Sequence, residues 1–273
     1  MYQEFYGFQD DPFNITPDPR FWFLTGKHQE ALNHLFYGIQ QRKGFICLTG
    51  EVGAGKTTLC RVLLDRLPAN VHTALILNPL LTETQLLAAA LREFGVTTKR
   101  LDRLRYLNEL NQYLLHVNSI GHDAVLIVDE AQDMPDQTLE MARLLSNLET
   151  ERQKLLQIVL LGQPELREKL RKPKFRQLAQ RITVRYHLGT LSRKETEAYI
   201  QFRLNAAGCL SRTGNVVSFD RGAVKEIHGY SQGTPRLINA LADKALLAGY
   251  VYRTWQIDRK TVRRAARELR EAA

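Results

Sequence analysis

The sequence predicts an α/β fold, in which helices sandwich a five-stranded parallel sheet and a small helical domain follows. Three observations lead to this prediction. Five apolar runs have the length of β-strands, helical patterns separate these runs, and after Leu188 only helical patterns are convincing. Strands that alternate with helices favour a parallel sheet with right-handed crossovers. We therefore expect an α/β domain over residues 1–188 and a helical domain over residues 189–273.

The predicted strands are rich in Val, Ile and Leu. The first four are nearly continuous apolar runs, which is typical of parallel strands that are covered on both faces. In chain order, the strands are Phe45–Thr49, Ala74–Asn78, Val125–Asp129, Gln157–Leu161 and Ile182–Leu188.

Helical periodicity fills the segments between these strands. The helices expected there are Thr57–Leu67, Thr82–Phe94, Leu101–Val117, Gln137–Leu148, Pro164–Leu170 and Phe175–Arg181. In the second domain, Ser192 followed by Glu195 predicts a capped helix start, and Gly208 predicts its end. Three more helices are expected over Asp220–Gly229, Thr234–Ala248 and Asp258–Glu271, with Tyr250–Trp255 as a candidate for a short strand.

Composition excludes several classes of protein. Hydrophobic residues make up 44% and charged residues 25% of the 273, as in ordinary globular proteins. No apolar run approaches the ~18 residues of a membrane-spanning helix, and the N-terminus lacks the pattern of a secretory signal. The three cysteines, Cys47, Cys60 and Cys209, fit neither a zinc site nor a disulfide framework. We therefore expect buried, reduced thiols and a cytoplasmic location.

Positive charge is concentrated in the second domain. The formal net charge is +9; residues 1–188 carry 23 Lys+Arg and 21 Asp+Glu, whereas residues 189–273 carry 15 and 8. Such a basic region suggests an anionic partner, namely nucleic acid, a membrane surface or an acidic protein. A solvated helical surface explains the same charge equally well.

A glycine-rich loop follows the first strand and precedes a helix. Residues 50–57 satisfy the pattern G-x-x-x-x-G-K-[ST] in that structural context. Backbone N–H groups of such a loop, together with the helix N-terminus, bind phosphates. Lys56 would contact the β- and γ-phosphates, and the Thr57 hydroxyl would bind Mg²⁺. The residues expected to bind a nucleoside triphosphate are Gly50, Glu51, Val52, Gly53, Ala54, Gly55, Lys56, Thr57 and Thr58.

Two carboxylates end the third predicted strand. Asp129 would hold Mg²⁺, and Glu130 would activate the attacking water. Consecutive residues of an extended strand point in opposite directions, so the two side chains can perform different tasks. An acidic residue in the position of Glu130 favours hydrolysis of ATP over mere binding of the nucleotide.

Polar residues near the last two strands complete the candidate site. Gln163 follows the fourth strand, where it would orient the water or contact the γ-phosphate, although a helix-entry turn before Pro164 is the alternative. Arg181 and, as second choice, Arg176 precede the fifth strand and are candidates for an arginine finger donated to a neighbouring subunit. The surrounding stretch is basic, so contact with nucleic acid is the alternative. Arg236, at the start of a helix, would sense the γ-phosphate from the second domain.

In combination, these residues resemble the AAA+ ATPases, in which a P-loop core carries a helical lid. The resemblance covers essentially the whole chain and extends to the ExeA/GspA family, which includes the MshM-like ATPases of pilus assembly. The matching segments are Tyr6–Pro19, Gly50–Thr57, Val128–Gln132, Leu161–Leu166 and Gly233–Arg236. The resemblance implies that residues Phe13–Asp18 and His28 help to form the adenine pocket.

The resemblance leaves two functions open. The first is a homo-oligomeric ATPase with ATP and Mg²⁺ at subunit interfaces, which powers or regulates the assembly of a secretion or pilus apparatus through envelope-assembly proteins. The second is an ATP-dependent regulator of transposition, similar to TniB and MuB, which binds duplex DNA and recruits a transposase. The longer ExeA/GspA proteins continue into a transmembrane segment and a peptidoglycan-binding part, whereas these 273 residues include neither. A short family member and a part of a longer protein are both consistent with that difference.

Overall fold

The computed structural model describes residues 1–14, 18–99, 102–151, 153–208 and 216–271. The chain forms two compact units. The first, called here the α/β unit, comprises Gly26–Gly50 and Lys56–Leu188. The second, called the helical unit, comprises Met1–Thr25, Glu51–Gly55 and Gly189–Ala273.

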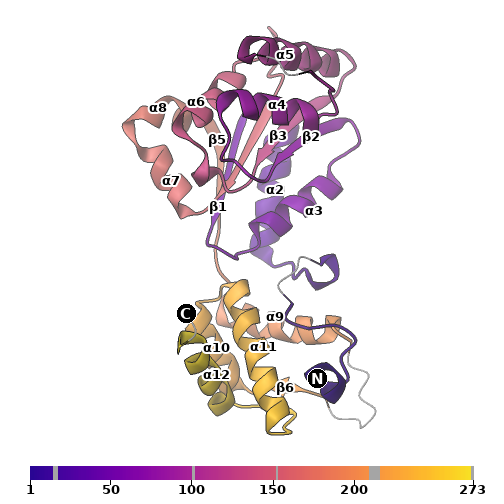
Figure 1. Cartoon of the computed structure of the whole chain (residues 1–273), viewed down its shortest axis with the longest axis vertical. Helices are drawn as coiled ribbons and strands as arrows, with labels where there is room; N and C mark the ends of the chain where they lie inside the picture. Colours follow the sequence, from indigo (N-terminus) through magenta and orange to yellow (C-terminus); the bar gives the residue numbers. More distant parts are fainter. Residues whose placement is uncertain (15–17, 100–101, 152, 209–215, 272–273) are drawn as a thin grey trace. The chain divides into compact units, whose positions relative to one another are not determined.

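The α/β unit contains the predicted five-stranded parallel sheet (Figure 1). Its strands lie in the order β2-β3-β4-β1-β5, and every neighbouring pair is parallel. The strands are β1 (Phe45–Gly50), β2 (Val71–Ile76), β3 (Asp123–Val128), β4 (Gln157–Gly162) and β5 (Ile182–Leu188). The fold prediction is confirmed. β2 begins three residues before its predicted start, because Val71, His72 and Thr73 pair with β3 although only Val71 is apolar.

Helices cover both faces of this sheet. Phe45 and Cys47 of β1 belong to one core cluster together with residues of α4 to α8. Ile46, between them, faces the opposite side, where a Cβ atom at Gly38 of α2 would lie 2.5 Å from its Cδ1 atom. The helices are α2 (Gly26–Gln40), α3 (Lys56–Arg66), α4 (Glu83–Glu93), α5 (Arg103–Ser119), α6 (Asp136–Leu145), α7 (Pro164–Arg171) and α8 (Arg176–Arg181), with 3₁₀ turns η2 (Ala131–Asp133) and η3 (Pro173–Phe175).

Local sequence signals explain most of these helix boundaries. Thr82 forms a capping box with Gln85 at the start of α4, and Asp102 caps α5. Helix α2 was not anticipated from the sequence, although Ala31, Leu35 and Ile39 form a buried stripe at helical spacing. Cys47 and Cys60 are buried free thiols, as expected, whereas Cys209 lies outside the described residues.

The described residues of the helical unit form helices α9 to α12, which Figure 1 labels, and a two-stranded parallel sheet. The expected capping box of Ser192 and Glu195 begins α9. The suggested strand at Tyr250–Trp255 is wrong, because α11 continues to Val251 and Tyr250 packs its ring 5.4 Å from that of Phe5. The elements are α9 (Arg193–Ala206), β6 (Ser218–Phe219), α10 (Arg221–Ser231), α11 (Pro235–Val251), β7 (Gln256–Ile257) and α12 (Arg259–Glu271).

The N-terminal residues pack into the core of the helical unit, whereas the sequence predicts them as an extension of the α/β domain. This segment contains α1 (Tyr2–Tyr6) and η1 (Pro19–Phe21). It contributes Tyr6, Phe8, Phe13 and Phe21 to the same hydrophobic cluster as residues of α9 to α12. Aromatic side chains bury large apolar areas, so four of them anchor the segment firmly.

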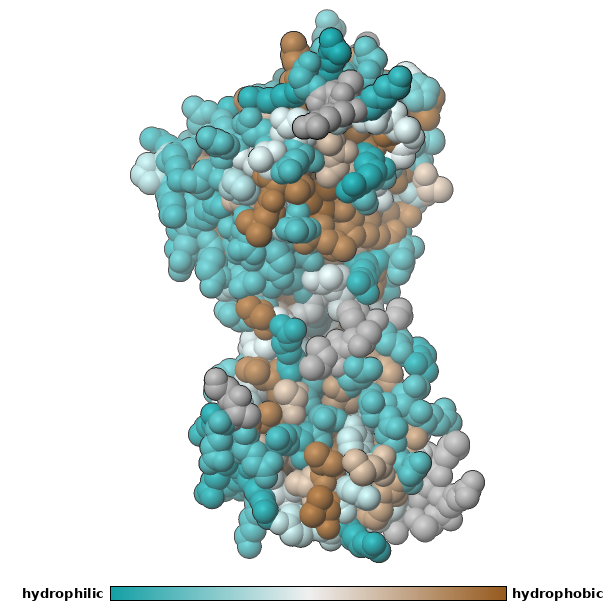
Figure 2. Space-filling view, in the orientation of Figure 1, coloured by the Kyte–Doolittle hydropathy of each residue, from teal (hydrophilic) through white to brown (hydrophobic). Residues whose placement is uncertain are grey.

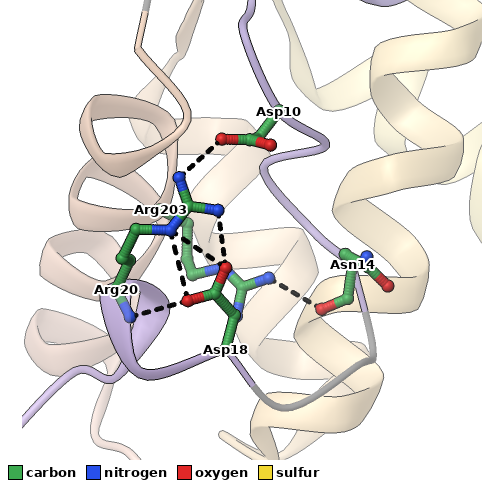
Figure 3. A network of polar contacts seen from close by, with 5 residues as sticks. All are labelled: Asp10, Asn14, Asp18, Arg20 and Arg203. Carbon is green, nitrogen blue, oxygen red and sulfur yellow. Dashed lines mark hydrogen bonds and ion pairs between the residues drawn. The ribbon is translucent and has the colours of Figure 1, made fainter.

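Polar contacts reinforce this anchoring (Figure 3). Arg203 of α9 is only 6% exposed; it donates to the Asn14 carbonyl at 2.8 Å and also to the Pro12 carbonyl. Its guanidinium group lies 4.6 Å from the ring centre of Phe21. At the surface, Arg20 forms ion pairs with Asp10 at 2.9 Å and Asp18 at 2.7 Å. The buried arginine therefore joins α9 to backbone about 190 residues earlier in the chain.

The visible surface of both units is mostly hydrophilic, with smaller apolar areas (Figure 2). Exposed large apolar side chains include Leu77 and Leu80, which follow β2. In the part of the chain that the structure describes, no helix combines the length and the apolar character needed to span a bilayer.

Candidate nucleotide-binding site

Three of the predicted site residues, Asp129, Glu130 and Gln163, lie at the carboxyl ends of neighbouring strands of the α/β unit. β4 lies between β1, which leads into the glycine-rich loop, and β3, which leads into the carboxylates. In open α/β sheets, ligands bind outside the carboxyl ends of the strands. Asp129, Glu130 and Gln163 come directly after β3 and β4 at this edge.

Glycine is required by the backbone of the loop. Gly53 and Gly55 have φ angles of 76° and 96°, in the left-handed region that residues with a Cβ atom rarely adopt. The N–H of Ala54 donates to the carbonyl of Glu51 at 3.0 Å and tightens the turn. A Cβ atom at Gly50 would lie 2.8 Å from the Leu188 carbonyl oxygen, so this position also excludes a side chain.

Lys56 begins α3, and its ammonium group stays close to the loop. The residue is 5% exposed, and its Nζ atom donates to the Gly50 carbonyl at 2.8 Å. A buried ammonium group beside backbone N–H groups of a glycine-rich loop is suited to polyphosphate binding.

Thr57 and Asp129 bring together oxygen atoms of the kind that Mg²⁺ prefers. The Thr57 hydroxyl donates to Asp129 Oδ2 at 2.6 Å, although the two residues are 72 positions apart in sequence. The Glu130 N–H donates to Asp129 Oδ1 at 2.9 Å and holds the carboxylate, which is 3% exposed. A hydroxyl and a carboxylate fit magnesium, which favours one or two carboxylates together with substrate phosphates. Thr58, the next residue of α3, is half-buried.

Glu130 is held by two side-chain amides. Its Oε2 atom accepts from Gln132 Nε2 at 2.9 Å and from Gln163 Nε2 at 3.0 Å. Gln163 is also the residue before Pro164 at the start of α7, so it takes part in the helix entry as well as in this cluster. The structure therefore joins the ends of β3 and β4 through the Glu130 carboxylate.

The surroundings of Glu130 favour its ionised form. Burial by itself raises the pKa of the carboxyl group. The hydrogen bonds from Gln132 and Gln163 and the positive charge of Lys56 outweigh burial, so the pKa lies below its ordinary value. The side chain is therefore a carboxylate at neutral pH, as a proton acceptor must be.

Sequence reasoning assigned no role to Gln132. It lies in η2, two residues after Glu130, within a segment whose resemblance to the family was noted. The 3₁₀ turn that directs its side chain to Glu130 was not expected. The sequence does contain one signal for Gln132, because it is a polar residue only two positions after the candidate catalytic carboxylate of Glu130.

The two candidates for an arginine finger, Arg176 and Arg181, lie at the two ends of α8. Arg181 donates to Ser146 Oγ at 3.0 Å and also contacts Asn147, after the end of α6. Arg176 is exposed at the start of α8. In the helical unit, Arg236 is exposed near the start of α11, and a Cβ atom at Gly53 would lie 2.5 Å from its Cβ atom.

The residues expected near adenine have different surroundings. Phe13 is 2% exposed in the core of the helical unit, and its ring lies 6.2 Å from that of Phe219. His28 is 5% exposed in α2. Ile15, Thr16 and Pro17 lie outside the described residues.

Comparison with known proteins agrees with the fold and the motifs. A family model described as an AAA domain matches residues 39–170. General secretion pathway protein A of Aeromonas hydrophila is 46% identical over 270 residues, which are 98% of this chain and 48% of that protein. The chain thus spans about half the length of this relative.

Solved structures share the fold at low sequence identity. The ORC2 protein of Aeropyrum pernix, solved in an ADP form, matches with a TM-score of 0.69 and 17% identity over 96% of this chain and 73% of that one. Cdc6p from Pyrobaculum aerophilum matches with a TM-score of 0.69 and 18% identity over 95% and 71%. The RuvB Holliday junction branch migration motor of Thermotoga maritima matches with a TM-score of 0.57 and 18% identity over 88% of this chain and 69% of that one.

The strand order, the glycine-rich loop with Lys56, and the carboxylates at the end of β3 are the features by which P-loop nucleotide-binding proteins are recognised. The extensive identity to a general secretion pathway protein narrows the assignment further. This chain belongs to the ExeA/GspA family of AAA+ ATPases.

Proposed function

We propose that the chain binds ATP with Mg²⁺ and hydrolyses it to ADP and phosphate. The observation that carries this proposal is the cluster at the ends of β3 and β4, in which Thr57 contacts Asp129 and Glu130 stands next in sequence. A site that only bound nucleotide would need one carboxylate for the metal, which Asp129 can supply. It would not need a second carboxylate that is both ionised and fixed in position. The Glu130 carboxylate is such a group.

Each residue has a distinct task in this proposal. The loop N–H groups and Lys56 bind the phosphates, and Thr57 and Asp129 hold Mg²⁺, which neutralises charge on the β- and γ-phosphates. Glu130 accepts a proton from the attacking water while the oxygen of that water bonds to the γ-phosphorus. The bond from the γ-phosphorus to the bridging oxygen breaks, and ADP leaves with that electron pair.

Calorimetry and phosphate release test the proposal together. We expect ATP to bind in the presence of MgCl₂, phosphate to be released, and EDTA to stop the release. Well-folded protein that takes up no ATP with magnesium present would rule the proposal out.

We further propose that the protein works as an oligomer in which Arg181, or else Arg176, stabilises the γ-phosphate of a neighbouring subunit. Arg176 is exposed, which suits it to contact another copy, while Arg181 rests on Ser146. A guanidinium group donated in this way typically accelerates hydrolysis by roughly 10³- to 10⁵-fold. Mixing Arg181→Ala subunits with Glu130→Gln subunits tests this. A Glu130→Gln subunit still supplies the arginine, and the neighbouring Arg181→Ala subunit still supplies the intact Glu130 carboxylate. Activity restored in the mixture supports Arg181 as the finger, and an active Arg181→Ala protein alone excludes it.

Residues 189–273, which belong to the helical unit, are proposed to act as the lid of the nucleotide site, with Arg236 sensing the γ-phosphate. The placement of Arg236 near the start of α11 supports this, as does its closeness to the loop residue Gly53. Residues 1–188 would then form the nucleotide-binding domain with its N-terminal extension, whose first 25 residues pack within the helical unit, and His28 would lie near adenine. ATP binding that is weakened by Arg236→Ala supports the sensor role.

The biological role that we propose is to power or regulate assembly of a secretion or pilus apparatus from the cytoplasm. The 46% identity to General secretion pathway protein A supports it, although only 48% of that relative is spanned. Co-purification with envelope-assembly proteins tests this role.

A second candidate is an ATP-dependent regulator that binds duplex DNA and recruits a transposase. The charge of α12 favours it, because Arg259, Lys260, Arg263, Arg264, Arg267 and Arg270 lie on 13 residues. Glu226 offsets part of this charge, since it pairs with Arg259 at 3.0 Å and Arg263 at 3.1 Å. Binding through phosphate contacts falls steeply with salt. A mobility-shift titration with ATP that shows no binding even at low salt would exclude this candidate.

A further inference from the structure

Gln132 connects two groups that the sequence places more than thirty residues apart. Its Nε2 atom donates to Glu130 Oε2 at 2.9 Å and to Asp133 Oδ2 at 3.1 Å, while its Oε1 atom accepts from the Gln163 N–H at 3.0 Å. Both ends of this one amide are therefore used, one on the carboxylate after β3 and the other on the backbone after β4. A side chain fixed at both ends has little freedom to rotate.

The neighbouring structure is arranged around this amide. A Cβ atom at Gly162, the last residue of β4, would lie 3.0 Å from Gln132 Oε1 and 2.7 Å from Leu166 Cδ2. Glycine at this position therefore leaves room for the amide. From the other side, Lys169 of α7 donates to the Gln132 carbonyl at 3.1 Å and to the Met134 carbonyl, which fixes the η2 turn.

Glu130 needs such support because its own backbone is unusual. Its φ angle of 50° is in the left-handed region, which costs energy for a residue other than glycine. The bonds from Gln132 and Gln163 both fall on the same oxygen atom, Oε2. The direction of the carboxylate is thus set by the two amides rather than by the backbone alone.

We propose that Gln132 is a positioning residue for ATP hydrolysis, which holds the Glu130 carboxylate in the direction needed to take a proton from water. This inference rests on the proposed ATPase activity. In this role Gln132 acts through Glu130, so its loss should lower turnover and spare nucleotide binding.

The test is a steady-state comparison of the wild type with Gln132→Met, whose side chain has similar length and cannot form any of the three hydrogen bonds. The loss of one hydrogen bond to a charged group corresponds to a roughly 10- to 100-fold lower kcat. We expect KM for ATP and Kd for ADP to stay within about twofold, because no phosphate contact is lost. Gln137→Met, an exposed glutamine five residues further on, is the matched control and should retain the wild-type kcat.

Repeating the substitution in a Glu130→Gln variant distinguishes a positioning role of Gln132 from a general loss of structure. In Glu130→Gln protein, single-turnover hydrolysis should show no further loss when Gln132→Met is added, because the group that Gln132 serves is already gone. An unchanged kcat in Gln132→Met overturns the inference. It is also overturned by a parallel rise in KM and fall in melting temperature, or by a further tenfold loss in the Glu130→Gln background.

Failure of the underlying function would look different. If the chain is not an ATPase, the wild type will release no more phosphate than Lys56→Ala does. Gln132 then has no role in hydrolysis. If only the Gln132 inference is wrong, the wild type turns over ATP and Gln132→Met matches it.

Discussion

The two units bury charged side chains for different purposes. Among the described residues, Lys56 and Asp129 are the buried charged groups of the α/β unit, and both lie where the nucleotide is proposed to bind. In the helical unit, the buried charge is Arg203, which contacts the Pro12 and Asn14 carbonyls of the N-terminal segment. Similar burial is therefore proposed to serve ligand binding in the α/β unit, whereas in the helical unit it connects distant parts of the chain. Substitutions should accordingly reduce function in the α/β unit and stability in the helical unit.

Glu130→Gln should have the largest effect. We expect hydrolysis to fall roughly 10²- to 10⁴-fold, the range that a positioned general base contributes. Binding of ATP and the melting temperature should stay close to the wild type, because the amide has the same shape as the carboxylate. Phosphate release, calorimetry and thermal unfolding check this. Normal hydrolysis would remove the assigned role, and a large loss of stability would break the comparison.

Lys56→Ala should have the second largest effect, which is a loss of affinity for ATP. Removing one partner of a desolvated charge pair costs about 2–5 kcal/mol of binding free energy, so ATP affinity should fall by that amount. Circular dichroism should show the α/β unit still folded, since the sheet core is aliphatic. Arg61→Ala, an exposed position of the same helix, is the control for loss of positive charge. Equal affinities of Lys56→Ala and Arg61→Ala for ATP would contradict the assigned phosphate contact.

Arg203→Met should act on stability instead. It leaves two carbonyl groups without their buried donor, which costs about 2–4 kcal/mol of unfolding free energy. Both tryptophans, Trp22 and Trp255, lie in the helical unit, so their fluorescence in urea reports on that unit alone. Exposed Arg193→Met is the control. If the two variants unfold at the same urea concentration, the buried arginine does not hold the N-terminal segment.

Tyr6→Phe should give the smallest of these effects. The Tyr6 hydroxyl donates to the Leu246 and Thr254 carbonyls at 3.2 and 3.1 Å, while its ring is fully buried. Losing the hydroxyl alone should cost about 1 kcal/mol of unfolding free energy, measured by the same fluorescence. Exposed Tyr252→Phe should cost nothing measurable. A cost above that of Arg203→Met would reverse the ranking within the helical unit.

The sequence predicted the α/β unit well because its signals are local. A continuous apolar strand, a glycine-rich loop and two adjacent carboxylates can each be recognised within about ten residues. Thr57 and Asp129 were predicted to share one ion, and the structure places their side chains 2.6 Å apart. Their roles at that ion remain predictions.

The rest depends on contacts that no local pattern reveals. Tyr6 bonds to Leu246 at a separation of 240 residues, so nothing near Tyr6 in sequence indicates that the N-terminal segment packs with the helical unit. Gln132 was missed for a related reason. Its importance arises from the 3₁₀ turn and from the neighbouring end of β4, which meet only in the folded chain.

The lack of a side chain at Gly162 has an evolutionary consequence. A methyl group there would lie 2.7 Å from Leu166 Cδ2, 2.9 Å from Leu166 Cβ and 3.0 Å from Gln132 Oε1, so it has no room while both neighbours stay as they are. A homologue with alanine at the end of β4 should therefore differ from this chain at the position of Leu166 and should also lack the glutamine amide. A homologue that keeps glycine there can vary at the glutamine without this constraint.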